Sequence, residues 1–525
     1  MTTQRRTLRL GTDELSALRE PRDCAILAEQ PDGVDAYRLA EGPFRSYERT
    51  IEVTNSGPDD HEVVETIDWT LSIPLWWLVF WLPTWLWFRS GMKKDRPWWA
   101  PAGRLDTRSG TVVGLLAIIA VVNGYLGTVI GQTLTFAADE FCGEFSFDAE
   151  GLRTCVDPGA DQSVRGNIFS IVRVAILLSV GLTALADRKG RRRVLAGAVG
   201  IGCVATAAGA LAPSLTVLTL TQIVARGLAT GIGIVMLVLA TEELPARSRA
   251  YGVSLLILAA GLGSGMVLWV LPLADIADWS WRLVYALGGL FAVPAVWAGL
   301  KLPVGRRFAH NKAAGSTSSL GELWNNRTLR NRLILLSVSG LLAAVFSQPA
   351  SQLHNDFLRS EQGFSGTDIS IFTLTSSTPV GIGVFLGGLL ADRTGRRFTA
   401  AVGTVLGASL FLASLFTSGA PLWLLTLAGV VFGGIAVPAV GVYGPELFPT
   451  RLRSTANGVI RTTAVLGSVA GLQIVSRLYE RWDALGPALA VTLAGPLILG
   501  VLFLVAYPET ADRTLESIND EPEFA

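Results

Sequence analysis

The chain has 525 residues, of which 50% are hydrophobic and 16% are charged, with a formal net charge of zero. This is more apolar surface than soluble domains of this size usually bury, so most of it is expected to lie in lipid. The neutral balance gives no bias toward nucleic acid, and the place of each charge along the chain matters more than the total. These features argue against a soluble globular protein and against a nucleic-acid partner.

Residues 1–66 are polar and net acidic, and they are predicted to form a cytoplasmic extension. Residues 42–54 and 61–73 each alternate apolar and polar side chains, with the turn sequence SGPDD between them. This pattern indicates a β-hairpin. The start of the chain lacks the continuous apolar core of a secretion signal, so an uncleaved N-terminus is expected.

Residues 67–108 comprise a Trp-rich stretch and a basic linker. Tryptophan favours the headgroup boundary, because its ring is apolar while its N–H needs a polar partner. The apolar run from Ile73 to Phe88 is shorter than the roughly 20 residues that a spanning helix needs. An amphipathic helix on the membrane surface is therefore favoured over an extra spanning helix.

Twelve apolar segments follow, and each is long enough to cross about 30 Å of hydrocarbon as a helix. Loops rich in Lys and Arg alternate with acidic or nearly uncharged loops, and the longest basic loop includes residues 305–331. By the positive-inside tendency both ends of the bundle are cytoplasmic, with residues 508–525 as a tail. The segments are approximately 110–138, 164–186, 193–212, 215–241, 250–273, 282–303, 332–354, 368–390, 398–418, 422–443, 455–477 and 485–507.

The four cysteines lack metal-ligand spacing, and neither a metal nor a cofactor is expected. Cys142 and Cys155 share the first outer loop, and a disulfide between them is a hypothesis that requires this loop to face an oxidising side. Three scattered histidines and the lack of a nucleophile–base cluster argue against an enzyme.

Two loop motifs occur twice. ADRKGRRR begins at Ala186 and ADRTGRR at Ala391, 205 positions later. EELPARSR begins at Glu242 and ELFPTRLR at Glu446, 204 positions later. Two motifs with nearly the same offset indicate a duplicated six-helix unit, here 109–304 and 332–507. Because each unit has an even number of helices, the halves should be related by an axis along the membrane normal.

These paired loops, with PETADRTLESI after the last helix, resemble the major facilitator superfamily, and within it the sugar and metabolite porters. The resemblance covers about residues 105 to 520. It implies an all-α integral membrane fold with twelve transmembrane helices in two six-helix halves. The implied function is secondary-active or facilitative transport of a small organic solute by alternating access. The alternatives are a drug or xenobiotic efflux transporter and a transporter-like solute receptor.

The substrate stays open, because the sequence departs from the porters. Residues 302–308 lack the acidic residue usual after the sixth helix, and the seventh segment lacks the usual glutamine pattern. The fifth segment lacks the proline signature of drug/proton antiporters. The expected partners are the solute and membrane lipid, with protons as a candidate coupling ion, for a monomer in the cell membrane.

The loop charges are interpreted as a cytoplasmic gate. Asp187 and Asp392 lie where the next helix begins, and a carboxylate there is favoured by unpaired N–H groups. We hypothesise that these charges hold the halves together in the outward-open state; the alternative is that they only fix topology. The gate residues are Asp187, Arg188, Arg191, Glu242, Arg249, Asp392, Arg393, Arg396, Glu446 and Arg453.

Charged and polar residues within helices are the candidate substrate-binding residues. Unpaired, Arg173 and Arg226 would each cost several kcal/mol in hydrocarbon, so each should face a wet cavity or a partner. No Asp or Glu falls in the middle of a predicted helix, which leaves facilitated diffusion open, and the two buried arginines raise an anionic substrate as a hypothesis. The other candidates, each also consistent with helix-to-helix hydrogen bonding, are Asn123, Tyr125, Gln132, Gln348 and Tyr443.

Overall fold

The chain folds into two units, each of which is described by itself. The N-terminal unit comprises Met1–Leu116 with Glu243–Arg249, and the bundle unit comprises Ala117–Glu242 with Ala250–Ala525. The computed structural model describes residues 2–56, 60–74, 77–91, 96–141, 145–147, 153–155, 176–303, 320–354, 357–358, 361–364, 366–482 and 484–519.

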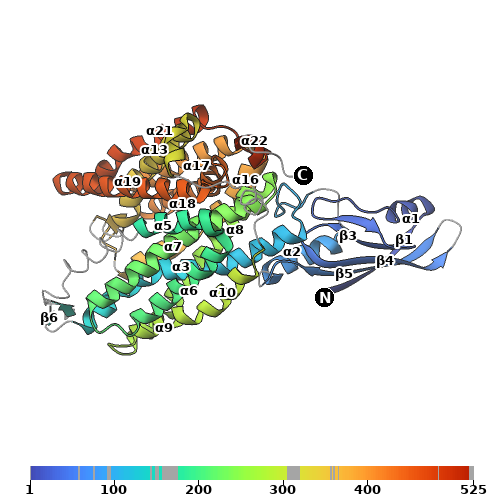
Figure 1. The fold of residues 1–525 in the computed structure, drawn as a ribbon, viewed down its shortest axis with the longest axis horizontal. Coiled ribbons are helices and arrows are strands. Elements are labelled where there is room, and N and C mark those ends of the chain that lie inside the picture. Colours follow the sequence, from blue (N-terminus) through green and yellow to red (C-terminus); the bar gives the residue numbers. More distant parts are fainter. Residues whose placement is uncertain are drawn as a thin grey trace. The chain divides into compact units, whose positions relative to one another are not determined.

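A five-stranded antiparallel sheet is the framework of the N-terminal unit (Figure 1). The predicted hairpin is confirmed as two central strands, with Thr50 opposite Thr66. The sequence analysis missed the other three strands; the first of them is an Arg-rich edge strand, whose alternation is weak because none of its residues is buried. In spatial order the strands are β1 (Thr2–Leu10), β5 (His61–Leu71), β4 (Phe44–Ser56), β3 (Ala36–Glu41) and β2 (Ala28–Pro31).

Two helices cover this sheet. Along β5 every second residue from Val63 to Trp69 is buried, as the period of a strand requires. The short helix α1 (Thr12–Leu18) packs Leu15 near Val63, and α2 (Trp77–Arg89) packs Trp87 and Phe88 near Trp69. The Trp-rich stretch is therefore a helix that shares the core of the sheet.

The other side of α2 is apolar and exposed. Leu78, Leu82 and Leu86 repeat every four residues and are 67%, 51% and 51% exposed. With 13 residues, α2 extends about 20 Å, which is too short to cross about 30 Å of hydrocarbon. Its location on a membrane surface stays a prediction.

An ion network fixes the interior of the N-terminal unit. The Arg49 side chain is fully buried and donates to Glu29 at 2.8 Å, and it pairs with Glu65 at 3.4 Å. Tyr47 donates to Glu29 at 2.5 Å, and burial together with this carboxylate holds the pKa of Tyr47 well above its usual value. Buried charges of this kind are stable only when they are paired, so the sheet is a tightly specified unit.

The bundle unit consists of two groups of helices (Figure 1). The first group is α5 (Ile176–Lys189), α6 (Arg191–Gly209), α7 (Leu215–Glu243), α8 (Arg249–Val270), α9 (Trp281–Leu290), α10 (Ala292–Lys301) and most of α3 (Thr107–Glu140). The second is α13 (Arg327–Gln352), α15 (Gly366–Ser377), α16 (Val380–Thr394), α17 (Arg396–Ser414), α18 (Gly419–Glu446), α19 (Arg453–Trp482), α20 (Leu485–Ala490) and α21 (Ala494–Val505). The remaining elements are β6 (Phe145–Phe147), β7 (Arg153–Cys155), α12 (Leu320–Asn325) and α22 (Leu515–Asn519), with 3₁₀ turns at Ala246–Ser248, Leu271–Asp275 and Val491–Leu493.

Within the described residues, 10 helical segments are long and apolar enough to cross a membrane. They coincide with ten of the twelve predicted segments. The second predicted segment is described from Ile176 onward as α5, and the third is α6, which has three arginines at its start. The all-α membrane fold is confirmed.

Glycines bring paired helices into backbone contact. A Cβ added to Gly263 on α8 would lie 1.7 Å from the carbonyl oxygen of Val121 on α3. In the second half, a Cβ on Gly467 of α19 would lie 2.4 Å from the carbonyl oxygen of Leu341 on α13. Gly263 and Gly467 are 204 positions apart, so the repeat seen in the loops extends to helix packing.

We predict that Gly263→Ala destabilises the protein, because the new methyl group overlaps backbone that cannot move without separating α3 from α8. Overpacking typically costs about 1–3 kcal/mol, so the unfolding temperature in detergent should fall. The controls are Gly261→Ala and Gly265→Ala on the same helix, where an added Cβ has no atom within 4 Å. Equal unfolding temperatures for all three variants would contradict the packing argument.

Candidate functional site

A cavity of about 1150 Å³ lies in the bundle unit. Its wall comes from α3, α7 and α8 of the first half and from α13, α17, α18, α19 and α21 of the second. Most lining residues are Gly, Ala, Leu, Ile or Val, and no Asp or Glu occurs among the lining residues that the structure describes. The cavity therefore suits a largely apolar solute, with any charge met by a few basic groups.

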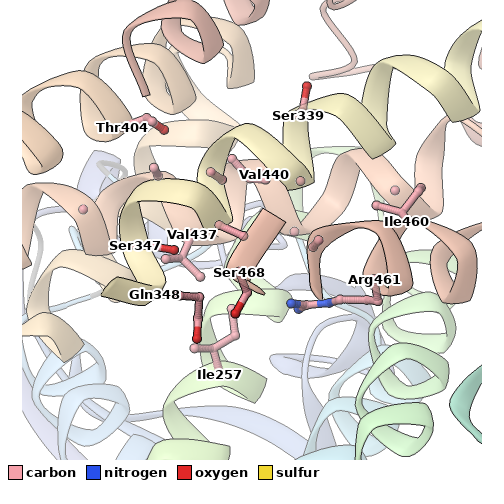
Figure 2. A pocket seen from close by; sticks show the side chains of 18 of the residues that line it. Ile257, Ser339, Ser347, Gln348, Thr404, Val437, Val440, Ile460, Arg461 and Ser468 are labelled. Atoms are coloured by element: carbon pink, nitrogen blue, oxygen red, sulfur yellow. The ribbon is translucent and has the colours of Figure 1, made fainter. Parts of the chain in front are cut away.

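Arg461 on α19 is one of the two arginines that line this cavity, and its side chain is drawn in Figure 2. Figure 2 shows its guanidinium pointing into the cavity, toward the side of Gln348, Ser468 and Ile257. The side chain is exposed, and its guanidinium has no hydrogen bond or ion pair with any described residue. A charge at this depth marks a position where a ligand or water supplies the missing partner.

The sequence analysis missed Arg461. It lies eight residues after Arg453, within the eleventh predicted segment, and was not among the arginines proposed to lie in the membrane. Eight residues correspond to about 12 Å of helical rise, which places Arg461 inside the hydrocarbon layer. The repeat also distinguishes it, because the equivalent position 204 residues earlier is Ile257.

Four of the predicted substrate-binding residues line the cavity: Arg226, Asn123, Gln348 and Tyr443. Asn123 Oδ1 and the Tyr443 hydroxyl are buried and have no hydrogen-bond partner among the described residues. Both polar atoms therefore lack the partner that buried polar groups normally have.

The other predicted residues of the site lie elsewhere. Tyr125 is 1% exposed and its hydroxyl donates to the Val284 carbonyl at 2.6 Å, so it packs within the first half. Gln132 is not among the lining residues. Arg173 and Cys142 lie outside the described residues, as does the side chain of Cys155, so the disulfide stays a hypothesis.

Asp187, at the end of α5, binds the start of a helix from the other half. Its carboxylate accepts the backbone N–H of Thr455 at 2.8 Å and that of Ser454 at 3.3 Å, in the first turn of α19. It also accepts the Thr455 hydroxyl at 2.9 Å and Arg191 at 3.0 Å. The first N–H groups of a helix have no partner within the helix, and its dipole favours an anion there.

Glu242 completes this first cluster. Its two carboxylate oxygens pair with Arg191 of its own half and with Arg453 of the other half. All four charged side chains are at most 2% exposed. Because a buried carboxylate is costly without partners, the cluster stabilises contact between the halves only while both are in place.

Asp392, at the end of α16 in the second half, makes the equivalent contact with a helix of the first half. Its carboxylate accepts the backbone N–H of Tyr251 at 2.8 Å and that of Ala250 at 3.3 Å, in the first turn of α8. Arg396 donates to Asp392 at 3.3 Å and also pairs with Glu446. Each half therefore supplies an aspartate that caps a helix of the other half.

The remaining three predicted gate residues differ in burial. Arg188 and Arg393 are exposed, one position beyond the buried aspartates. Arg249 begins α8 and is 2% exposed, and it belongs to the N-terminal unit. Arg191, Arg396 and Arg453 are among the buried arginines that pair with the gate carboxylates.

The C-terminal tail supports the second cluster. Glu509 accepts the backbone N–H of Arg396 at 3.0 Å and that of Arg397 at 3.3 Å, and Asn519 donates to the Glu446 carbonyl at 2.8 Å. Burial alone would raise the pKa of Glu509, but its backbone hydrogen bonds, foremost that of Ala511, outweigh burial and lower it. The carboxylate therefore stays ionised at the start of α17.

Two helical halves around a cavity, joined by reciprocal charged contacts at one end, define a membrane transporter architecture. A family model described as the Major Facilitator Superfamily matches residues 116–471 and 349–522. The chain belongs to the Major Facilitator Superfamily. It is a transporter that moves a small solute across a membrane, and not an enzyme.

Two relatives come from Acinetobacter baylyi. The niacin transporter NiaP is 25% identical over 388 residues, which cover 67% of this chain and 87% of that protein. The cis,cis-muconate transport protein is 25% identical over 244 residues, which cover 45% of this chain and 57% of the relative. This chain therefore covers less than two thirds of the muconate protein.

Solved structures share the fold. The proton:xylose symporter XylE, bound to 6-bromo-6-deoxy-D-glucose, has a TM-score of 0.62 at 17% identity and covers 78% of this chain and 98% of its own. The human organic anion transporter MFSD10 has a TM-score of 0.58 at 14% identity. The match covers 75% of this chain and 97% of MFSD10. At these identities the likeness concerns the fold alone.

We predict that Asp187→Asn and Asp392→Asn each loosen the helix that the aspartate caps. A hydrogen bond to a charged group contributes roughly 1.5–3 kcal/mol, so the capped amides should exchange hydrogen at least about tenfold faster. Hydrogen–deuterium exchange by mass spectrometry measures this. Asp187→Asn should act mainly on Ser454 and Thr455, and Asp392→Asn on Ala250 and Tyr251.

Each variant serves as the control for the other. A uniform rise of exchange over the whole bundle would indicate general unfolding. Unchanged exchange at the capped amides would contradict the capping role.

Proposed function

We propose that this transporter carries a small organic anion with a carboxylate group by alternating access. The observation that carries the proposal is the guanidinium of Arg461, which points into the cavity without a partner among the described residues. Arg226, from the other half, lines the same cavity. A carboxylate matches the planar donor geometry of arginine and can accept two parallel hydrogen bonds.

The surroundings of Arg461 support an anion with an apolar body. No acidic side chain competes for the guanidinium among the described lining residues, and the wall is mainly aliphatic. The compounds named for the two bacterial relatives, muconate and niacin, are both carboxylic acids. An organic cation would instead meet two arginines and no counter-charge in this part of the wall.

The two charge clusters support a gating role. Asp187 and Asp392 join the halves at one end of the bundle, while Arg226 and Arg461 come from different halves around the cavity. An anion that contacts both arginines would draw the halves together around itself. Opening at the gated end would then require the aspartates to leave the helix starts, which is the step that alternating access needs.

We predict that Arg461→Gln weakens transport of carboxylates such as nicotinate by about tenfold or more. The charge-assisted hydrogen bond that is lost contributes roughly 1.5–3 kcal/mol, and about 1.4 kcal/mol corresponds to a factor of ten in affinity. Uptake of radiolabelled nicotinate, muconate and xylose into proteoliposomes measures this. Nicotinate or muconate should be taken up, and xylose should not.

The matched control is Arg477→Gln, which removes an exposed arginine from the outer part of the same helix and away from the cavity. It should retain uptake. Equal uptake by Arg461→Gln and Arg477→Gln, or a preference for xylose over both carboxylates, would contradict an anion-binding Arg461.

We also infer the setting of the chain in the cell membrane. The basic loops support a cytoplasmic location for both ends of the bundle. Both charge clusters are completed within one chain, which supports a monomer. The exposed apolar side of α2, with Arg89 at its end, supports its insertion into the lipid interface, since Trp and basic residues favour this region.

We predict that a fluorophore attached at Leu82→Cys, in a background without the native cysteines, shows blue-shifted emission in nanodiscs and is quenched by spin-labelled lipid. Leu82 lies on the exposed side of α2. The control site is Val34, which is 95% exposed in the same unit and lies far from α2 in the sequence. Equal quenching at both sites, or at neither, would rule out an interfacial α2.

A further inference from the structure

The linker before the first membrane helix is bonded to a loop of the gate. The Ser248 hydroxyl donates to the Gly103 carbonyl at 2.8 Å and accepts the Gly103 N–H at 3.1 Å. Ser248 is fully buried. A Cβ added to Gly103 would lie 2.9 Å from the Ser248 hydroxyl oxygen, so the linker and the loop are in close contact.

A second set of bonds joins the same two segments. Arg108 pairs with the Glu243 carboxylate at 2.9 Å, and the Ser109 hydroxyl donates to the Glu243 carbonyl at 3.0 Å. The loop is thus bonded at both of its ends. We call these contacts, between residues 103–109 and residues 243–248, the linker clamp.

The linker is also bonded to the sheet. Arg104 pairs with Glu41 at 3.0 Å and donates to the Cys24 carbonyl at 2.7 Å. The Thr107 hydroxyl donates to the Phe44 carbonyl at 2.8 Å. Five of the residues from 103 to 109 therefore bond the sheet or the loop, and Glu243–Arg249 falls in the same compact unit as the sheet.

This connection is specific to one half. The residue equivalent to Ser248 in the second half, 204 positions later, is Leu452, whose side chain cannot form hydrogen bonds. The loop sequence has thus diverged at the position that meets the linker. The duplicated gate is symmetric in its aspartates and asymmetric in this attachment.

We propose that the N-terminal unit is a regulatory domain that, through the linker clamp, holds the 243–249 loop in the position of the closed gate. Glu242 directly precedes this loop, and Ala250 and Tyr251, which Asp392 caps, directly follow Arg249. Opening the gate moves the end of α7 and the start of α8, which this loop joins. The loop must then either move together with the sheet or break its hydrogen bonds to the linker. The clamp therefore shifts the population toward the closed state, and a ligand that displaces the sheet opens the gate.

This inference rests on the gate described under the proposed function, and it is independent of the substrate. The test uses the full-length double variant Arg104→Gln/Ser248→Ala, with hydrogen–deuterium exchange as the measurement. We expect exchange of the Ala250 and Tyr251 amides to be about tenfold faster, because several hydrogen bonds that hold the loop are lost. Arg19→Gln is the matched control, since it removes a charge that pairs with Asp35 in the same unit and outside the clamp.

Three results are decisive. Faster exchange at 250–251 in the double variant, with Arg19→Gln unchanged, supports the proposal. Faster exchange at Gly103 and Ser248 without a change at 250–251 overturns it, because the clamp would then be independent of the gate. Unchanged exchange at all of these amides overturns it as well, because the clamp would not hold the loop.

Asp392→Asn, measured in parallel, separates this proposal from the gate itself. If Asp392→Asn speeds exchange at 250–251 and the double variant does not, the gate stands and the regulatory role of the N-terminal unit fails. If Asp392→Asn also has no effect, the gate fails, and the clamp proposal fails with it.

Discussion

A buried carboxylate at the start of a helix from the opposite half is the interaction on which this architecture depends. Asp187 gives up its hydration to bind the first turn of α19, and Asp392 does the same at α8. Both carboxylates are stable there only while the N–H groups and arginines surround them. Intermediate separations would leave charges neither hydrated nor paired, so the contact favours two discrete states, joined or apart.

The two halves keep this gate and differ in the cavity. The loops repeat at offsets of 204 and 205, and the same offset relates Gly263 to Gly467. Arg461 faces the cavity from the second half, whereas its equivalent is Ile257; Arg226 does so from the first half, whereas its equivalent is Val430. A gate needs matched halves to close, but a site that binds one asymmetric solute does not. The gate residues have therefore been kept in both halves after duplication, whereas the cavity residues that would bind the solute have diverged.

Local patterns predicted the spanning segments, the hairpin and the gate arginines, because each depends on spacing along the chain. Asp187 near the end of α5 pairs with Arg191, the first residue of α6, across the turn at Gly190, whereas Arg188 is exposed. The capped amides at Ser454 and Thr455 are 267 and 268 residues from Asp187. Spacing carries no information on such contacts. Arg461 is a different case, since it lies within the eleventh predicted segment and helical rise alone places it in the hydrocarbon layer.

The N-terminal unit combines two features that have no reason to occur together in a passive extension. Its helix α2 presents an apolar side to the surroundings, and its linker bonds the loop between Glu242 and Arg249. The ion network around Arg49 stabilises the sheet on which α2 packs and to which the linker is bonded. If α2 lies in lipid and the loop moves with the sheet, a displacement of α2 in the interface is transmitted to the loop through the linker clamp. The state of the membrane surface would then bias the transport cycle without any contact with the solute.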